Sequence, residues 1–530
     1  MTKLHTARPA RISLAGMLLV VAASSAAAAQ EPYPGLDAYI AKAVQTWKIP
    51  GMSVAIVRND TVVYTKGFGT LSAQNHAAVN DQTLFEIGSS SKAFTATLVA
   101  MLVTDGKMRW EDHLSDYLPG FRLYDPVANE AVTLRDALTH RSGIARGELV
   151  WLGSGISRDD VLHRIRFLKP ESPFRSKYSY QNMMFLAAGQ AAGKAAGSSW
   201  DALIPQRIFG PLGMTSSVTT SKGLATTNVA RPHTLDHDTA IVEGMFDGEN
   251  IGPAGSILSN AKDMGQWLRF QLNDGVVGGK RLVNSTALRE THSPQILAVA
   301  GAPPAGRGGG GNPAASDSIP VTHFSSYGMG WFVEDYHGQL MWQHGGNTTG
   351  MTAAVGMLPE KHIGVAVLSN MQGAQLPAVV MHYIFDRALG LPMKDLSAEA
   401  YDRYLVQRKR ADSVAAAQAV DHPKDAKPPV PINAFVGTYA DSLYGEATVS
   451  IVEGQLELRR GDWHGALQYW NANNFRWLLP PGSPAGQINI KFEISPDNTV
   501  SGLWFGIGND LTLLGRKSTG GRGGRGGRGG

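Results

Sequence analysis

The 530-residue chain contains no cysteine. That absence excludes disulfide bonds, a cysteine nucleophile, thiolate metal sites and lipid attachment at a cysteine. No H-E-x-x-H zinc motif is present either, so we expect neither a metal nor any other cofactor. The chain also lacks G-x-x-x-x-G-K-[ST], the loop that cradles nucleotide phosphates, and G-x-S-x-G, the nucleophile elbow of α/β-hydrolases.

Long apolar runs are rare, and the longest lies at the start of the chain. Lys3, Arg8 and Arg11 form a basic segment, Ile12–Ala23 is apolar, and small residues follow up to Ala29. This pattern is typical of a secretory signal peptide over residues 1–29, with cleavage near Ala29. An uncleaved N-terminal anchor is the alternative interpretation. Export without disulfides predicts a periplasmic or secreted protein with no transmembrane segment in its mature part.

The basic character of the chain is concentrated at its two ends. The formal charge is +4, but it includes the three basic residues of the leader and three arginines of the tail GGRGGRGGRGG. The remaining chain therefore carries a small net negative charge, and we expect no nucleic-acid partner. We expect the tail, residues 518–530, to be disordered because it has nothing to bury.

The order of sequence patterns predicts an α/β (α+β) protein with two folded parts. Residues 52–58 and 61–69 read as a β-hairpin, residues 89–300 are mostly helical, and three strands follow at 340–370. Strands at both ends predict one antiparallel sheet with an inserted helical subdomain over residues 30–395. A helical, Pro-rich linker is expected over 396–432, and closely spaced short strands predict an all-β barrel over 433–517. The Gly/Pro-rich stretch 301–317 is expected to be a surface loop.

The stretch FEIGSSSKAF raises the question of which serine is reactive. Ser89 precedes a helical pattern in which Phe94 and Leu98 share a face, and Lys92 returns to the side of Ser89. A serine needs an adjacent base to attack an acyl carbon, and a desolvated lysine can be that base. A second S-x-x-K copy begins at Ser259, but there we expect the serine to cap a helix.

Further motifs follow Ser89 in a fixed order, and together they resemble the serine β-lactamase and penicillin-binding superfamily. They are LRDALTHRSG at 134–143, Y-Q-N at 180–182, PLGM at 211–214, YGMGW at 327–331 and HGG at 344–346. The resemblance covers roughly residues 35–390 and is closest to the class C-like branch, which also holds peptidases and esterases. It implies an acyl-enzyme mechanism on a small-molecule or peptide substrate.

The resemblance implies a role for each matching residue. Ser89 would be the nucleophile, Lys92 its base and Tyr180 a proton relay, and His344 would border the pocket. Asn182 and Gly346 would contact the substrate. The backbone N–H groups of Ser89 and Asn347 would form the oxyanion hole.

One departure from the family pattern bears on the substrate. β-Lactamases carry K-T-G where this chain has His344-Gly345-Gly346, and a largely neutral histidine grips a carboxylate less well than lysine does. This favours the peptidase or esterase branches over β-lactam turnover. Whether His344 donates a proton or binds a carboxylate stays open, as does a non-catalytic peptidoglycan- or lipid-binding protein on the same fold.

The C-terminal β-rich part resembles the lipocalin-like domain often attached to this branch. The likeness rests on the "GTY…YG" opening, residues Gly437–Tyr439 and Tyr444–Gly445. Such a domain could shape the active-site mouth or support homo-oligomers.

The two S-x-x-K copies make opposite predictions for covalent labelling by an acylating probe. Ser89→Ala should abolish labelling because it removes the attacking oxygen, whereas Ser259→Ala should leave labelling intact. Intact-mass spectrometry after incubation with the probe measures both. Labelling that persists in Ser89→Ala would refute the assignment of the nucleophile.

Overall fold

The computed structural model describes residues 1–2, 33–224, 227–298, 322–420, 427–479, 487–506 and 511–517. Residues 3–29 of the expected leader, the 301–317 loop, part of the Pro-rich linker and the 518–530 tail lie outside the described residues.

An eight-stranded antiparallel sheet forms the centre of the larger part, in the order β2-β1-β14-β13-β12-β11-β10-β9. The first hairpin pairs with the last strand along its whole length, so the two ends of this part close one sheet, which confirms the prediction. The strands are β1 (Gly51–Arg58), β2 (Thr61–Gly69), β9 (Ile296–Leu297), β10 (Ser325–Tyr327), β11 (Phe332–Tyr336), β12 (Gln339–Thr348), β13 (Met351–Leu358) and β14 (Ile363–Ser369).

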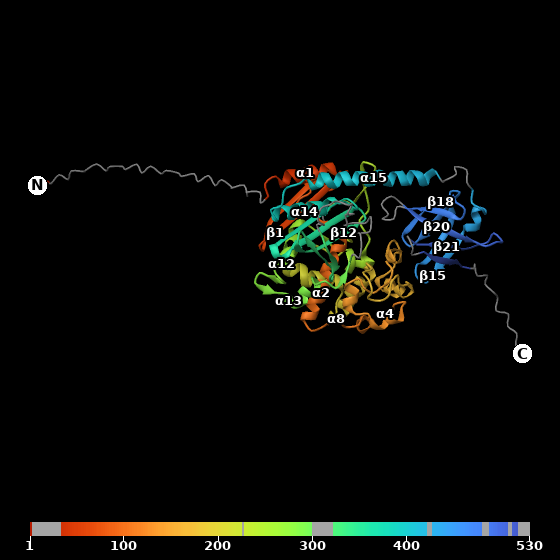
Figure 1. Cartoon of the computed structure of the whole chain (residues 1–530), viewed down its shortest axis with the longest axis horizontal. Coiled ribbons are helices and arrows are strands. Elements are labelled where there is room, and N and C mark those ends of the chain that lie inside the picture. Colours follow the sequence, from red (N-terminus) through yellow and green to blue (C-terminus); the bar gives the residue numbers. More distant parts are fainter. Residues whose placement is uncertain are drawn as a thin grey trace.

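Helices cover both faces of this sheet, as Figure 1 shows. Alternate residues of β1 enter different cores: Val54 and Ile56 pack with the terminal helices, while Ala55 and Val57 pack with the inserted helices. Because β1 is buried on both faces, its sequence is a nearly continuous apolar run. The terminal layer is α1 (Leu36–Thr46), α14 (Leu376–Ala388) and the start of α15 (Leu396–Val420); the inserted layer includes α2 (Ser91–Thr104), α8 (Asn182–Ala196), α11 (Gly252–Gly255), α12 (Ala261–Leu272) and α13 (Ser285–Thr291).

Short helices and strands of two or four residues complete the inserted part. They are α3 (Leu114–Tyr117), α4 (Pro126–Ala131), α5 (Leu134–Leu138), α6 (Glu148–Trp151), α7 (Arg158–Arg164), α9 (Trp200–Ile204), α10 (Gly210–Leu212), β3 (Phe85–Glu86), β4 (His233–Asp236), β5 (Thr239–Val242), β6 (Leu258–Ser259), β7 (Val276–Val277) and β8 (Lys280–Arg281).

The helix that follows Ser89 is more deeply buried than one apolar face would require. Every residue of α2 from Ser91 to Leu102 is buried, because α8, α11 and α13 surround it. Phe94 stacks on Trp267 of α12 with ring centroids 3.8 Å apart. The start of α2 is therefore fixed in the interior of the larger part.

The second S-x-x-K copy corrects one prediction, because Ser259 does not cap a helix. Ser259 lies in β6 opposite Phe85, and its hydroxyl is 2.8 Å from the hydroxyl of Ser217. The cap of α12 is Asn260, whose side-chain oxygen accepts from the backbone N–H of Asp263 at 2.8 Å. Asparagine is as good a cap as serine, and the strand pairing of Ser259 shifts the helix start by one residue.

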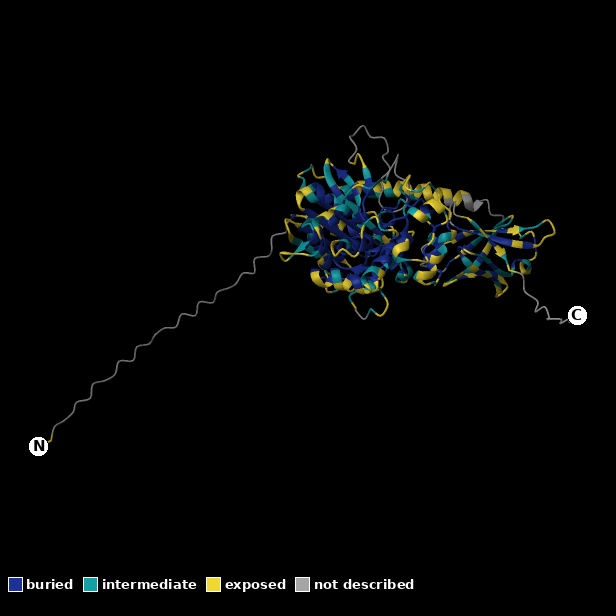
Figure 2. Cartoon of the chain, turned by 90° about the horizontal axis from the view of Figure 1, so that it is seen from below, coloured by how far each residue is buried: buried dark blue, intermediate teal, exposed yellow. Residues whose placement is uncertain are grey.

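The C-terminal part is a closed eight-stranded barrel, as predicted. Its strands are β15 (Gly437–Asp441), β16 (Gly445–Val452), β17 (Gln455–Arg460), β18 (Trp463–Asn471), β19 (Asn474–Leu478), β20 (Gln487–Ile494), β21 (Val500–Phe505) and β22 (Thr512–Arg516). In β20 buried and solvent-facing positions alternate, which is typical of a barrel wall with a filled interior. Figure 1 shows the barrel beside the larger part, with α15 running along one side of the larger part toward the barrel, and Figure 2 shows the same two parts from below.

Among the residues described, no helix is both long enough and apolar enough to span a bilayer.

The corrected cap leads to a stability prediction. Asn260→Ala should lower the free energy of unfolding by about 1 kcal/mol, because the N–H of Asp263 loses its acceptor, whereas Asn260→Ser should keep most of it. The midpoint of urea unfolding, followed by tryptophan fluorescence, measures the difference. Equal midpoints for the alanine and serine variants would contradict this role for Asn260.

Candidate active site

Ser89 lies in a single 3₁₀ turn, Gly88–Ser90, which leads directly into α2. The turn is possible because Gly88 adopts φ +51°, a left-handed conformation that favours glycine. Strand β12 lies against this turn, and a Cβ on Gly88 would come within 2.8 Å of the backbone nitrogen of Asn347. The hydroxyl of Ser90 donates to the carbonyl of His344 at 3.1 Å, so helix and strand are joined at the site.

Three oxygens surround the amine of Lys92. Its Nζ lies 2.7 Å from Oδ1 of Asn182, 2.9 Å from the carbonyl oxygen of Ala254 and 3.1 Å from Oγ of Ser89. The first two oxygens can only accept hydrogen bonds. A neutral amine would give its two hydrogens to them, which leaves its lone pair directed at the hydroxyl of Ser89.

Burial makes that neutral amine easier to form. Lys92 is fully buried, and desolvation lowers its pKa well below the ordinary value. The nearby Glu148 carboxylate raises this pKa and the Arg146 guanidinium lowers it, but both act less strongly than desolvation. Lys92 thus has the position and the electrostatic environment of a general base.

Tyr180 completes the contacts of Ser89. Its phenol donates to Oγ of Ser89 at 2.8 Å, and its ring centroid is 4.7 Å from Nζ of Lys92. Burial raises the pKa of Tyr180, so its proton stays on the phenol. His140, from the THRSG stretch, accepts the backbone N–H of Gln181 at 3.0 Å and packs its ring 4.3 Å from that of Tyr180. It therefore supports the segment that carries both Tyr180 and Asn182.

Glu148 and Arg146 belong to the site and were missed from the sequence. Asn182 donates its side-chain N–H to Glu148 at 3.1 Å, so it holds Lys92 at one end and a carboxylate at the other. Arg146 donates to the same carboxylate at 2.8 Å, and its guanidinium lies 5.1 Å from the ring centroid of Tyr180. The only signal in the sequence was that two charged residues lie three and five positions after the THRSG stretch, and such residues are usually solvated.

His344 is close to the site, but both of its ring nitrogens are occupied. Nδ1 lies 2.6 Å from the carbonyl oxygen of Gly345, and Nε2 lies 3.0 Å from the hydroxyl of Tyr327. The carbonyl can only accept, so Nδ1 carries the hydrogen and Nε2 accepts from Tyr327. Burial, with a smaller contribution from Lys92, lowers the pKa of His344 to about 3. This neutral, engaged ring fixes β12, and we assign it a positioning role.

The strand beside Ser89 needs glycine at position 346. A Cβ there would come within 1.8 Å of the carbonyl oxygen of Ile87, which no backbone adjustment of a few tenths of an ångström could relieve. Gly346 thus allows the contact between β12 and the Ser89 turn and brings the backbone of Asn347 next to Gly88. The buried Glu86 accepts from Thr348 at 2.6 Å and from the N–H of Phe246 at 2.8 Å, which ties the end of β12 to β3.

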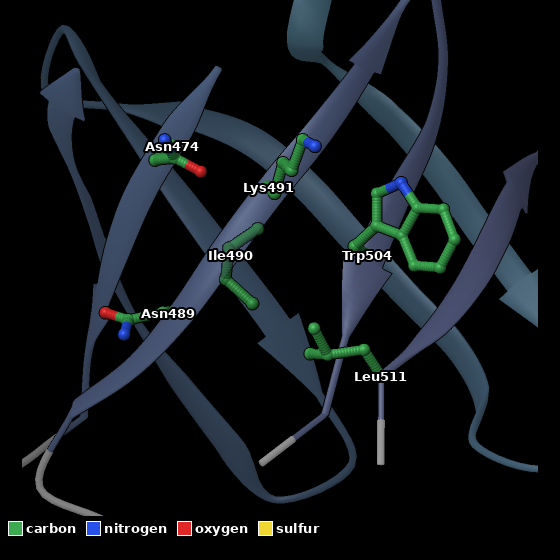
Figure 3. A pocket seen from close by; sticks show the side chains of 6 residues that line it. All are labelled: Asn474, Asn489, Ile490, Lys491, Trp504 and Leu511. Atoms are coloured by element: carbon green, nitrogen blue, oxygen red, sulfur yellow. The ribbon is translucent and has the colours of Figure 1, made fainter. Parts of the chain in front are cut away.

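A separate hollow lies on the barrel, and its lining offers no equivalent chemistry (Figure 3). Lys491 and Trp504 are cross-strand neighbours there. Among the described residues, the lining is Asn474, Asn489, Ile490, Lys491, Trp504 and Leu511, which include no nucleophile with an adjacent base. Within the described part of the chain, no cluster of histidine, aspartate and glutamate could hold a metal ion.

Comparisons with known proteins match both parts of the chain. The family model described as Beta-lactamase matches residues 36–387, and one described as a domain of unknown function matches residues 421–517. The unguisins hydrolase ungD of Aspergillus violaceofuscus is 27% identical over 457 residues, covering 79% of this chain and 77% of its own. Penicillin-binding protein 4 of Amycolatopsis lactamdurans is 29% identical over 330 residues, covering 61% and 81%. An octameric penicillin-binding protein homologue from Pyrococcus abyssi shares the fold with a TM-score of 0.59 at 20% identity, covering 91% and 98%.

The geometry predicts the pH dependence of acylation. The rate should rise with pH as Lys92 loses its proton, at a pH well below its ordinary pKa, and should not fall again while Tyr180 keeps its proton. Lys92→Arg should lower kcat/KM by about 10²–10⁴-fold, because a guanidinium stays protonated. Measuring kcat/KM across pH 5–10 with a p-nitrophenyl ester tests this.

Two variants separate Lys92 from its titrating neighbours. His344→Gln should leave the position of the pH limb unchanged, because His344 is already neutral throughout this range. Glu86→Gln tests the other candidate, since burial raises the pKa of Glu86 to about 7. If the rise of kcat/KM with pH disappeared in either variant, Lys92 would not be the group that controls this pH dependence.

Proposed function

Because the chain belongs to the β-lactamase family, we propose that it is a serine hydrolase that cleaves an amide or ester through an acyl-enzyme on Ser89. The observation that carries the proposal is the pair of contacts at Oγ of Ser89. A buried amine lies 3.1 Å away on one side and a protonated phenol 2.8 Å away on the other. The pKa of Lys92 is lowered and the pKa of Tyr180 is raised. The amine therefore loses its proton readily while the phenol keeps its proton, as a base and a proton donor require.

The first half of the reaction follows from these contacts. Oγ of Ser89 attacks the acyl carbon while its proton moves to Nζ of Lys92, and the carbonyl oxygen becomes an oxyanion. The N–H groups of Ser89 and Asn347 would stabilise that charge. When the tetrahedral intermediate collapses, the bond to the leaving amine or alcohol breaks, and the proton returns to that group from Lys92 through Tyr180.

The second half repeats the sequence with water as nucleophile. Water attacks the acyl carbon and gives a proton to the Tyr180–Lys92 pair, and the bond to Ser89 then breaks as Oγ recovers a proton. Asn182 holds Lys92 in place through both halves, since its side-chain oxygen accepts from Nζ at 2.7 Å. The side-chain NH₂ group of Asn182 already donates one hydrogen to Glu148. Asn182 therefore has one N–H left to donate to a substrate amide.

The surroundings of His344 favour amides and neutral esters over β-lactams. A buried histidine with a pKa of about 3 offers no positive charge where K-T-G enzymes have lysine. A β-lactam carboxylate would thus lack its main cationic partner on this strand. The names of two relatives, a hydrolase of unguisins and a penicillin-binding protein, are compatible with an acyl-transfer chemistry of this kind.

Three further assignments stay proposals. Residues 1–29 would direct export to the periplasm or the exterior and be removed. The chain would divide into a hydrolase part over 30–395, a linker over 396–432 and a lipocalin-like barrel over 433–517. The barrel would support homo-oligomers, a proposal suggested by the octameric homologue of similar fold.

A substrate panel on the protein without its leader tests the proposed function. It contains nitrocefin, a short-chain p-nitrophenyl ester, a D-alanyl amide and an acyl-D-Ala-D-Ala peptide, with Ser89→Ala as the control. We expect Ser89-dependent turnover of the ester or the D-alanyl amide, with nitrocefin slower, because no lysine stands at position 344. No turnover of any compound, together with no labelling by penicillin or fluorophosphonate probes, would favour a binding protein instead.

A further inference from the structure

The barrel contacts the larger part at the segment that carries Glu148. Helix α6 begins at Glu148, and the next residue, Leu149, gives its backbone carbonyl to the barrel. The donor is Arg460 at the end of β17, whose Nη2 lies 2.5 Å from that carbonyl oxygen, while its Nε donates to the carbonyl of Tyr444 at 3.2 Å. One side chain thus joins barrel and hydrolase part.

Arg460 is an unusual connector because it is a buried cation that no carboxylate of the described residues contacts directly, although Asp441 is near enough to raise its pKa and Arg164 near enough to lower it. Its exposed fraction is 2%, and no carboxylate within the described residues lies within ion-pair distance of it. It lies over the rings of Phe505 and Tyr444, at 5.0 and 5.8 Å from their centroids. Burying a charge in this way is costly, and two backbone carbonyls and two aromatic faces compensate only in part.

The residues that follow Arg460 extend the contact over the next turn of the same segment. The N–H of Asp462 donates to the carbonyl of Gly153 at 3.2 Å. A Cβ on Gly153 would come within 2.1 Å of the indole of Trp463, and one on Gly461 within 2.4 Å of the carbonyl oxygen of Ser154. Segment 149–155 and the β17–β18 turn therefore fit together without room for side chains at two glycines.

A continuous series of contacts leads from this interface to Ser89. Leu149, held by Arg460, is adjacent to Glu148; Glu148 accepts from Asn182 at 3.1 Å, and Asn182 accepts from Lys92 at 2.7 Å. We propose that Arg460 is a positioning residue for the active site: the barrel holds α6 so that Glu148 keeps Asn182 and Lys92 aligned with Ser89. This rests on the proposed function for its catalytic readout.

The proposal makes the barrel part of the catalytic machinery rather than an attached module. Arg460 touches neither substrate nor the reacting atoms and acts only through the backbone of Leu149 and the side chain of Glu148. Its effect must therefore depend on Glu148 being present, which a merely stabilising residue would not require.

A double-mutant cycle between Arg460 and Glu148 tests this dependence. The readout is the acylation rate with a p-nitrophenyl ester, divided by the concentration of sites that a covalent probe labels, so that unfolded protein is not counted. Arg460→Met should lower the rate about tenfold in the otherwise native chain, as expected for loss of one charge-assisted hydrogen bond. In the Glu148→Gln background the same change should lower it less than about threefold. The proposal would be overturned if Arg460→Met lowered the acylation rate equally with and without Glu148→Gln, or if it left the rate of the otherwise native chain unchanged.

Arg459→Met is the matched control, because Arg459 is the preceding residue of β17 and is exposed. It removes the same side chain from the other face of the strand and should leave the acylation rate unchanged. Arg460→Lys should recover only part of the rate, since one ammonium cannot reproduce the two-pronged contact with Leu149 and Tyr444. A rate loss in Arg459→Met equal to that in Arg460→Met would overturn the proposal.

Hydrogen–deuterium exchange provides a readout that does not require turnover. Arg460→Met should speed exchange of the amides in 148–155 and at the start of α8, whereas Arg459→Met should not. If the wild-type chain turned over no substrate, the proposed function would fail, but exchange would still report whether Arg460 orders the Glu148 segment. Unchanged exchange at α8 in Arg460→Met would contradict the coupling, whatever the activity.

Discussion

The structure depends on keeping one lysine amine out of water next to a serine. Lys92 is fully buried, and desolvation makes its charged form unfavourable unless a carboxylate approaches. The fold instead gives Lys92 the side-chain oxygen of Asn182 and the carbonyl of Ala254, with Glu148 held one residue further away. These oxygens replace the hydrogen bonds that the Lys92 amine would make to water, and they stabilise its charged form less than a directly bonded carboxylate would.

The packing around the Ser89 turn follows from this requirement. The whole of α2 up to Leu102 is buried among α8, α11 and α13, so Lys92 enters the interior with its helix, while β12 packs against the turn that precedes it. The sheet can approach closely only because Gly88 and Gly346 lack side chains. The same close approach that excludes water from Lys92 brings the backbone of Asn347 beside Gly88, so the desolvation of Lys92 and the position of the Asn347 backbone share one structural cause.

Sequence patterns predicted what depends on local order and missed what depends on long-range packing. The closed sheet, the barrel and the family of the chain could be predicted, because apolar alternation and motif order are visible in the chain itself. The contacts of Ser89 with Lys92 and Tyr180 agree with the expected grouping, since the S-x-x-K spacing and the Y-x-N motif carry it. Glu148 and Arg460 could not be found, because their positions depend on contacts between segments up to 311 residues apart. The cap at Asn260 was displaced by one residue because β6 pairs with β3 and removes Ser259 from the helix.

Lys92 and Arg460 are both buried basic side chains without a directly bonded carboxylate among the described residues, yet their chemistry differs. Desolvation lowers the pKa of a buried ammonium, so Lys92 gives up its proton more readily than an exposed lysine does. A guanidinium resists, and burial lowers the pKa of Arg460 only to about 10, so it stays charged at neutral pH. The first side chain can therefore accept a proton during a reaction, while the second can only hold fixed dipoles such as the carbonyl of Leu149. Exchanging the two residue types would leave the site without a base and the barrel contact without a permanent charge.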